Sequence, residues 1–199
     1  MLFMSATLSA EIAIAAARLI VEEGMEYGPA KRRAARGFRH ARSAELPSND
    51  VVEDEVRAYL ELFHAESQPV ELAALRGIAA AWMAPLAVFR PYLAGAVWRG
   101  TATRLSSIHI DLYCDDSKAA ELGLLDMRVD YEVSSIDGPR GRTFDVLHVF
   151  VPSRDLGGSA HLAFTVLDYD DLRGALKVDA RGRSQRGDLA ALGTRMAAT

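Results

Sequence analysis

The sequence is poor in the features that mark secreted and membrane-bound proteins. Cys114 is the single cysteine among 199 residues, so no disulfide can form within the chain, which favours a reducing compartment. A membrane-spanning helix needs about 18 or more consecutive apolar residues, and the sequence has no such run. The N-terminal segment lacks the basic start of a signal peptide, and Glu11 interrupts its apolar stretch. We therefore expect a cytoplasmic protein with no membrane partner.

An excess of positive charge is also missing. The net charge is −4 and the isoelectric point is near 5.7, which disfavours nucleic acid as a partner. The densest positive charge is a short basic run at Lys31, Arg32, Arg33, Arg36, Arg39 and Arg42. Because Phe38 is the only aromatic residue among them, we interpret the run as a solvated helix face that pairs with the acidic segment 53–61. The alternative is that the run binds a nucleic-acid backbone or a nucleotide phosphate.

The first half of the chain has the periodicity of helices. Half of all residues are hydrophobic, which is enough for a buried core. Apolar residues that recur every three or four positions predict helices over 9–23, 50–63 and 69–89, and a short basic helix over 28–36. Pro85 lies inside the third of the long helices and is expected to kink it.

The second half has the composition of strands. Segments rich in β-branched and aromatic residues predict five strands, over 91–97, 106–114, 127–135, 142–151 and 160–169. A helix over 115–125 separates two of them, and Asp137-Gly138 marks a hairpin turn. The fold class is therefore α+β: a helical region, 1–90, packed on a mixed five-stranded sheet, 91–178. A tail, 179–199, has few large apolar residues and is expected to be mobile or loosely packed.

One stretch of the second half carries candidate chemistry. The segment "GAVWRG", 95–100, follows a short apolar strand, and a turn of small residues lets backbone amides face an anion. Ser107, His109 and Asp111 share one face of the next strand because side chains alternate with a period of two. Arg99 and Arg104 flank the turn and are candidates for phosphate contact. These residues together predict a groove for a nucleotide or a phosphate.

The layout resembles the nucleotidyltransferase superfamily typified by DNA polymerase beta and the minimal bacterial nucleotidyltransferases. The family pattern is an apolar strand, Gly-Ser, an Arg-Gly shortly after, and "S-D-I-D-L" on the next strand. Here "GAVWRG" and "SSIHI", 106–110, match it in spacing, and the resemblance covers roughly residues 90–170. It implies a nucleotidyltransferase-like sheet. It also implies that Ser107 and His109 stand where the family has two Mg²⁺-binding aspartates, and Ala96 where it has a phosphate-contacting serine.

The departures from this pattern fall on the metal ligands. Magnesium prefers hard oxygen ligands, whereas a histidine nitrogen favours zinc, copper or nickel. Loss of both carboxylates removes most of the electrostatic basis of a two-metal site. We therefore expect a catalytically degenerate, regulatory or ligand-binding member of the family that needs no cofactor. Its expected ligand-binding residues are Gly95, Ala96, Arg99, Gly100, Arg104, Ser107 and His109.

Two alternatives remain open. The first is an active nucleotidyltransferase with a divalent metal on His109, Asp111 and Asp145, in which Glu132, Asp130 or Asp145 supplies the third carboxylate from a neighbouring strand. Its catalytic residues would be Asp111, Asp145 and Glu132. Asp111 stands one pleat, about 6.6 Å, beyond the family position, whereas paired ions sit about 4 Å apart. The second is a helical module that binds a protein partner, with the sheet as a scaffold.

Two later predicted strands also contain histidines. His148 and His161 are further candidates for a transition-metal ligand, beside His109 and Asp111. Neither a helical His-x-x-x-His spacing nor a cysteine pair accompanies them. Hydrogen bonding within a polar groove and packing in the sheet are the alternative roles of these side chains.

A second resemblance lies outside the sheet. The head "AAARLIVEEGMEYGPAKRRAAR", 15–36, and "LRGALK", 172–177, resemble short bacterial proteins named UDP-N-acetylmuramate–alanine ligase. That ligase reaction depends on ATP, several domains and a P-loop with Gly-Lys-Thr/Ser, and this sequence contains no P-loop. We therefore do not expect the ligase activity.

Overall fold

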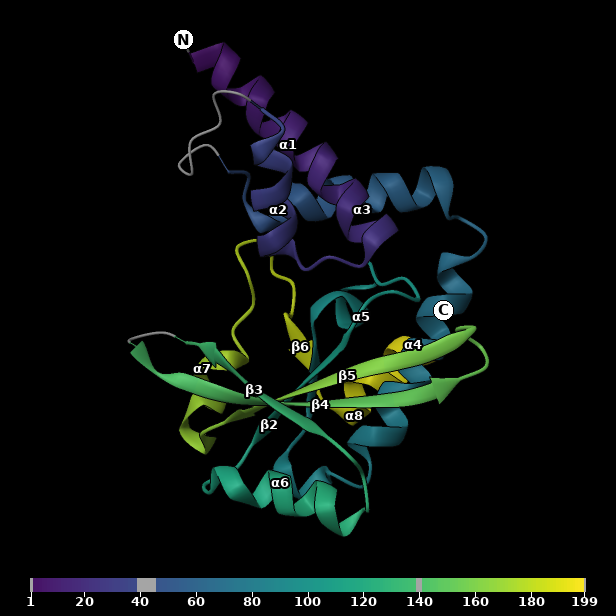
Figure 1. The fold of residues 1–199 in the computed structure, drawn as a ribbon, viewed down its shortest axis with the longest axis vertical. Coiled ribbons are helices and arrows are strands. Elements are labelled where there is room, and N and C mark those ends of the chain that lie inside the picture. The colour runs from purple at the N-terminus through teal and green to yellow at the C-terminus, as the bar shows by residue number, and fades with distance from the viewer. Residues whose placement is uncertain (1, 39–45, 139–140, 199) are drawn as a thin grey trace. The chain divides into compact units, whose positions relative to one another are not determined.

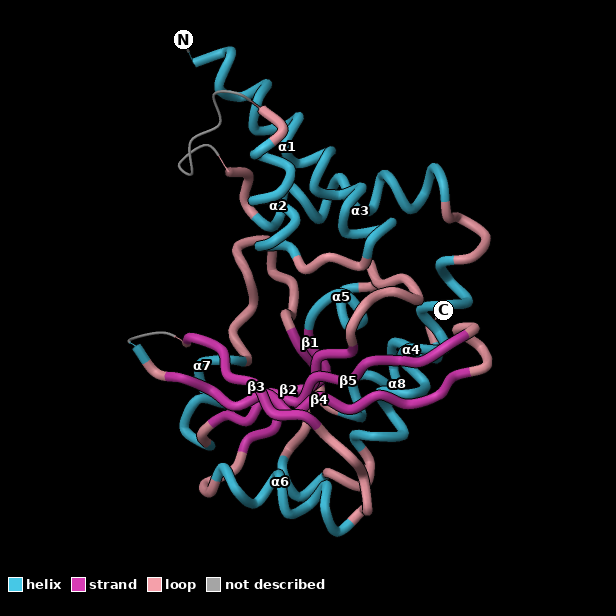
Figure 2. The backbone as a smooth tube through the Cα atoms, viewed as in Figure 1, coloured by secondary structure: helices cyan, strands magenta, loops and turns pink. Residues whose placement is uncertain are grey.

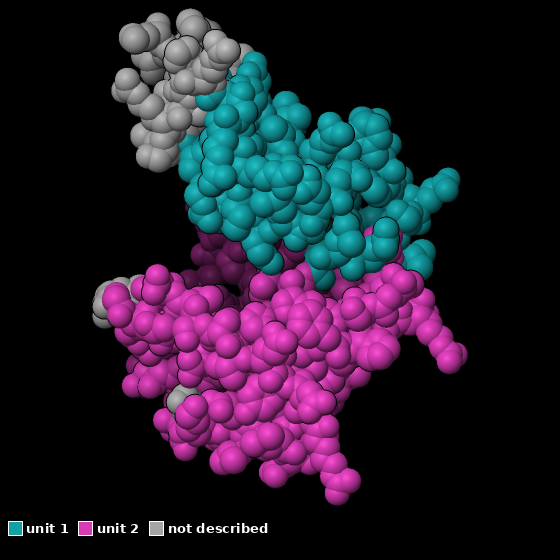
Figure 3. Space-filling view, viewed as in Figure 1, with its two compact units in different colours: residues 1–70, 101–106 teal, residues 71–100, 107–199 magenta. Residues whose placement is uncertain are grey.

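The computed structural model describes residues 2–38, 46–138 and 141–198, which form helices and one mixed sheet. The protein is α+β, as the sequence predicts. The chain divides into two compact units, shown in different colours in Figure 3. Unit 1 comprises residues 1–70 and 101–106, and unit 2 comprises residues 71–100 and 107–199. Among the helices of the described residues, none has both the length and the hydropathy needed to cross a membrane.

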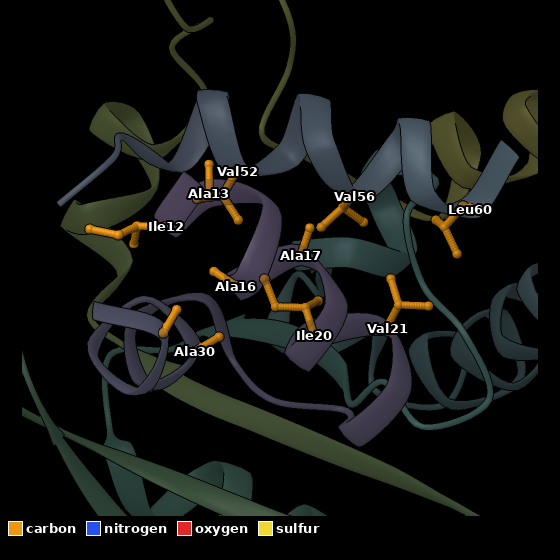
Figure 4. Close-up of a cluster of buried hydrophobic side chains, with 11 residues drawn as sticks. Ile12, Ala13, Ala16, Ala17, Ile20, Val21, Ala30, Val52, Val56 and Leu60 are labelled. Carbon is orange, nitrogen blue, oxygen red and sulfur yellow. The ribbon is translucent and has the colours of Figure 1, made fainter. Parts of the chain in front are cut away.

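Unit 1 is a cluster of three helices, α1 (Leu2–Glu23), α2 (Tyr27–Arg36) and α3 (Asn49–Phe63). Small and branched side chains on one stripe of α1 pack against α2 and α3, as helical periodicity predicts (Figure 4). Ser48 begins α3, where its side chain accepts a hydrogen bond from the Val51 N–H. The buried cluster consists of Ile12, Ala13, Ala16, Ala17, Ile20, Val21, Ala30, Ala34, Val52, Val56 and Leu60.

Two residues of the basic run pair with groups outside the acidic segment 53–61. Arg33 forms an exposed ion pair with Glu23 at the end of α1. The Lys31 ammonium donates to the Asn49 side chain over 2.7 Å, at the start of α3. Arg39 and Arg42 lie outside the described residues. The described part of the run is thus a solvated helix face held by local polar contacts.

Unit 2 is organised around a six-stranded sheet with the strand order β3-β4-β5-β2-β1-β6 (Figures 1 and 2). The strands are β1 (Tyr92–Ala94), β2 (Ile108–Tyr113), β3 (Glu132–Asp137), β4 (Thr143–Ser153), β5 (Gly158–Leu167) and β6 (Arg186–Gly187). β2 and β5 are parallel, and every other neighbouring pair is antiparallel.

Helices α4 (Gln68–Met83), α5 (Gly95–Arg99), α6 (Ser117–Asp126), α7 (Leu172–Ala175) and α8 (Leu189–Ala197) accompany the strands, and 3₁₀ turns cover Ala87–Phe89 and Tyr169–Asp171. The predicted kinked helix over 69–89 is in fact α4 followed by a separate 3₁₀ turn. Pro85 cannot donate a backbone hydrogen bond and clashes with the preceding turn, so the helix ends instead of bending.

The prediction of five strands is corrected by β6, and the segment predicted as a tail contains both β6 and α8. The two residues of β6 pair with β1, and Gly187 lies opposite Leu93. A Cβ on Gly187 would come within 2.0 Å of the Trp98 ring, so only glycine fits there. Trp98 donates its indole N–H to the Ser184 carbonyl over 2.9 Å, and the Arg195 guanidinium lies 3.9 Å from the centre of the Trp98 ring. Contacts that are distant in sequence thus order this segment, and composition gave no sign of them.

The sheet has two unlike faces because side chains alternate along each strand. The apolar face is lined by fully or almost fully buried residues: Leu93, Ile108, Ile110, Leu112, Leu147, Val149, Leu162 and Phe164. Trp82 of α4 packs on it, with its ring centre 5.8 Å from that of Phe164. The opposite face, here called the polar face, also carries buried Tyr113, Val146 and Ala163. Its polar side chains are His109, Asp111, Glu132, Ser134, His148, His161 and Thr165.

Candidate functional site: the polar face of the sheet

The predicted turn between β1 and β2 is present and lies against His109. Ala94 at the end of β1 is the strand partner of His109, and α5 begins at the next residue. Gly95 has φ +67°, and a Cβ there would lie 3.1 Å from the His109 ring. Glycine is needed because the turn combines a left-handed backbone with close packing on the imidazole. Gly100, with φ +83°, ends α5 in the same conformation.

The seven predicted ligand-binding residues divide between the two units. Gly95 and Ala96 are at the start of α5, and Arg99 and Gly100 are at its end. Ser107 and His109 complete the group in unit 2. Arg104 is exposed and belongs to unit 1, so it does not share a compact unit with the other six.

Asp111 is enclosed and already has a charged partner. It is only 9% exposed, and the Arg186 guanidinium forms an ion pair with it. The same guanidinium nitrogen donates to the Tyr113 hydroxyl over 2.7 Å. Burial raises the pKa of Asp111, although Arg186 and His109 both act to lower it. Burial likewise raises the pKa of Tyr113 to about 12. Sequence reasoning missed Arg186, because only the fold brings the tail to β2.

The predicted metal set His109, Asp111 and Asp145 does not converge. Asp145 stands three positions before His148 on β4, so alternation places it on the opposite face of the sheet from His109. There its carboxylate accepts a hydrogen bond from the Ser135 hydroxyl over 3.3 Å. β5 also separates β4 from β2, so β4 is not the neighbouring strand that the prediction required.

Glu132 does not supply the missing carboxylate either. It lies on the polar face as the strand partner of His148, but it is exposed and three strands away from β2, a span of about 14 Å. The residues of β5 opposite His109 and Asp111 are Ala163 and Thr165. Within the described ranges, no group of three or more His, Cys, Asp and Glu side chains is placed to hold a metal ion.

A continuous hydrogen-bond chain crosses the polar face instead. The Ser107 hydroxyl is 2.9 Å from His161 Nδ1, and the other nitrogen of that ring, Nε2, is 2.9 Å from His148 Nδ1. His148 Nε2 is in turn 2.7 Å from the Ser134 hydroxyl. Phe150 lies parallel to the His161 ring, with ring centres 4.7 Å apart. The sequence indicated three members of this chain separately, but their connection depends on strand register.

Hollows among the described residues also lie away from this hydrogen-bond chain. A groove of about 750 Å³ in unit 1 is lined by apolar side chains such as Ile14, Leu19 and Tyr59, between charged residues. A polar pocket of about 270 Å³ lies at the carboxyl ends of β2 and β5, beside Cys114 and Asp168. Burial and the surrounding carboxylates raise the pKa of Cys114, which keeps it a thiol and a poor nucleophile.

Comparison of the chain with models of protein families, with curated proteins and with solved structures found no match. The chemistry of the site therefore has to be argued from its own side chains. The polar face offers imidazoles, hydroxyls and a neutralised Asp–Arg pair.

Proposed function

We propose that unit 2 is a nucleotidyltransferase-like domain that has lost metal-dependent nucleotidyl transfer and serves as a binding or regulatory protein for a nucleotide or phosphate ligand. One observation carries the proposal. The face of β2 on which transfer requires a pair of carboxylates bears Ser107, His109 and a single carboxylate, Asp111, which is buried against Arg186. A metal ion there would have to displace Arg186 from a low-dielectric site, and breaking such a pair is costly.

The turn at Gly95 supports retention of a ligand site. An apolar strand, a left-handed glycine, a short helix and a strand with His109 on its polar face follow one another within 92–113. The Ser107 hydroxyl and the His109 imidazole offer hydrogen-bond groups, which can contact phosphate oxygens without a bridging metal. Binding without a metal is therefore the behaviour that separates this proposal from an active transferase.

The test is a thermal-shift series on the full chain with ATP, GTP, CTP, UTP and inorganic phosphate, each with and without Mg²⁺, Mn²⁺ or Zn²⁺. We expect at least one ligand to raise Tm without metal, because ligand at about 100 times its Kd stabilises by about 2.7 kcal/mol. His109→Ala should remove this shift. Ser135→Ala, which alters a serine on the opposite face of the sheet, should leave it unchanged.

Two outcomes contradict the proposal. A shift that needs a metal and disappears in Asp111→Ala supports the active transferase. The absence of any shift favours the helical partner-binding module, which stays a prediction.

A further inference from the structure

The chain Ser107–His161–His148–Ser134 uses both nitrogens of both imidazoles. A neutral imidazole has one N–H donor and one acceptor, so the direction of one bond fixes the others. If the Ser107 hydroxyl donates to His161 Nδ1, then His161 Nε2–H donates to His148 Nδ1, and His148 Nε2–H donates to Ser134. In this arrangement each imidazole N–H has an acceptor, and His161 presents a basic nitrogen to a serine hydroxyl.

The two imidazoles are arranged to share a proton. Their planes differ by 20°, and their centres are 5.1 Å apart with 2.9 Å between the facing nitrogens. The nitrogens thus face each other edge to edge, in the geometry of a nearly linear N–H···N hydrogen bond. For His148 and His161 to bind one metal ion together, both rings would have to rotate, because their facing nitrogens now point at each other.

The arrangement also satisfies the geometric requirements for an activated nucleophile. Such a site places a nucleophile within about 2.6–3.2 Å of a base that a third group orients. Ser107, His161 and His148 meet this condition with two distances of 2.9 Å. Ser134 occupies the far end of the chain on the exposed strand β3, where water competes for its hydroxyl, whereas Ser107 is half-buried.

We propose that Ser107 is a nucleophile, that His161 is its general base, and that His148 positions His161, so that unit 2 hydrolyses small uncharged esters. This activity goes beyond ligand binding, and it uses Ser107, which the proposed ligand site also contains. Uncharged substrates fit because Phe150 exposes 57% of its surface beside His161, and because Asp111 engages the Arg186 cation of this face. An exposed aromatic ring gives an apolar acyl or alcohol group a surface to contact.

The reaction balances with water as the only co-substrate. The Ser107 oxygen attacks the ester carbonyl carbon, and its proton passes to His161 Nδ1. The bond from carbon to the alcohol oxygen breaks, and that oxygen takes the proton from His161. Water then attacks the acyl-serine, gives a proton to His161, and the proton returns to the Ser107 oxygen as the acid leaves. While His161 is charged, its Nε2–H donates to His148, which stabilises the imidazolium.

The experiment is covalent labelling of the full chain with an alkyl fluorophosphonate, followed by peptide mapping, alongside the pre-steady-state burst with p-nitrophenyl acetate. We expect one adduct, on Ser107, with loss of fluoride, and a burst of one equivalent per chain. Ser107→Ala should abolish both signals. His161→Gln should slow labelling at least about a hundredfold, the lower range for removal of a general base.

Further variants separate positioning from folding. His148→Gln keeps an acceptor for the His161 N–H and should retain most of the labelling rate, whereas His148→Ala should lose at least about tenfold of it. Ser134→Ala and its neighbour Ser135→Ala, on opposite faces of β3, should both remain labelled on Ser107. Circular dichroism and thermal melts establish which variants fold.

An adduct on another residue, no adduct on Ser107, or equal rates in wild type and folded His161→Gln would each overturn the proposal. These outcomes are independent of nucleotide binding, because the thermal-shift series measures a different property of the chain.

Discussion

The two faces of the sheet in unit 2 come from the same strands and have opposite properties. On β2, Ile108 and Ile110 are fully buried on the apolar face, whereas His109 between them is half-buried on the polar face. On β5, Phe164 is fully buried, whereas His161, on the other face, takes part in the hydrogen-bond chain. Neighbouring residues of one strand therefore have different roles. Side chains on one face pack in the hydrophobic core, and those on the other form the hydrogen-bond chain and the Asp111–Arg186 pair.

This division means that the effect of a substitution should depend on its face more than on its residue type. Burial of apolar surface is the dominant favourable contribution to folding, and it is concentrated on one face. The polar face contributes to stability through a few enclosed groups, of which the Asp111–Arg186 pair is the clearest. Three pairs of variants test whether the effect of a substitution depends on its face, and the second pair is also compared across pH.

The largest difference is expected between Phe164→Ala and Phe150→Ala, the same change on the two faces. Phe164 is fully buried and packs on Trp82, so its loss should lower the free energy of unfolding by about 3–5 kcal/mol. Phe150 is 57% exposed and contacts His161, so its loss should cost less than about 1 kcal/mol. Urea unfolding of both variants measures the difference. Equal losses would show that the polar face carries as much packing energy as the apolar face.

The second comparison concerns the ion pair between Asp111 and Arg186 on the polar face. Arg186→Ala leaves the Asp111 carboxylate buried without its cation. This should cost about 2–3 kcal/mol at pH 7, less than the ~3–5 kcal/mol of a fully buried pair, because the Arg186 side chain is 23% exposed. Arg183→Ala is the control, because Arg183 pairs with Asp179 of the same tail, and without the Arg183 side chain that carboxylate still accepts hydrogen bonds from two backbone N–H groups and from Gln185. The control should cost less than about 1 kcal/mol.

The cost at Arg186 should also depend on pH in a defined direction. Burial raises the pKa of Asp111 in the folded state, so its protonated form is favoured by folding. The contribution of this group is therefore fully present below the ordinary aspartate pKa and is lost as pH rises through the raised value. Without Arg186 the pKa should rise further, so the deficit of Arg186→Ala should shrink as pH falls from 7 to 4. A deficit that grows over this range in urea unfolding would contradict the enclosed-pair interpretation.

The sequence predicted the strands that form both faces, but it did not predict their order in the sheet or the contact from Arg186. Alternation along β2 correctly placed Ser107, His109 and Asp111 on one side, because a period of two needs no tertiary information. The same rule could have excluded Asp145, which is separated by an odd number of positions from His148 on one strand. Strand order could not be read in this way, and β5 rather than β4 is the neighbour of β2.

Two elements of the tail were missed for different reasons. β6 has only two residues, too few to show a period. α8 did carry a signal, because Asp188 can begin a helix and Leu189, Leu192 and Met196 recur at helical spacing, but the low apolar content of the tail outweighed it. Arg186, on β6, then reaches Asp111, which lies 75 positions earlier in the chain. Interactions of this kind arise from strand order and register, and local composition does not encode them.

The smallest expected effect concerns the turn at Gly95, which packs against His109 on the polar face. Gly95 and Gly157 have almost the same backbone, φ +67° and φ +68°, but a Cβ on Gly95 would meet the His109 ring at 3.1 Å, whereas nothing lies within 4 Å of one on Gly157. Both alanine variants should lose about 1 kcal/mol from the left-handed conformation, and Gly95→Ala should lose about 1 kcal/mol more from crowding. The double variant Gly95→Ala/His109→Ala should recover that additional loss, since a cycle of single and double variants isolates the contact. If the two glycine variants unfold at the same urea concentration, the imidazole moves aside freely, and the turn does not fix His109 on the polar face.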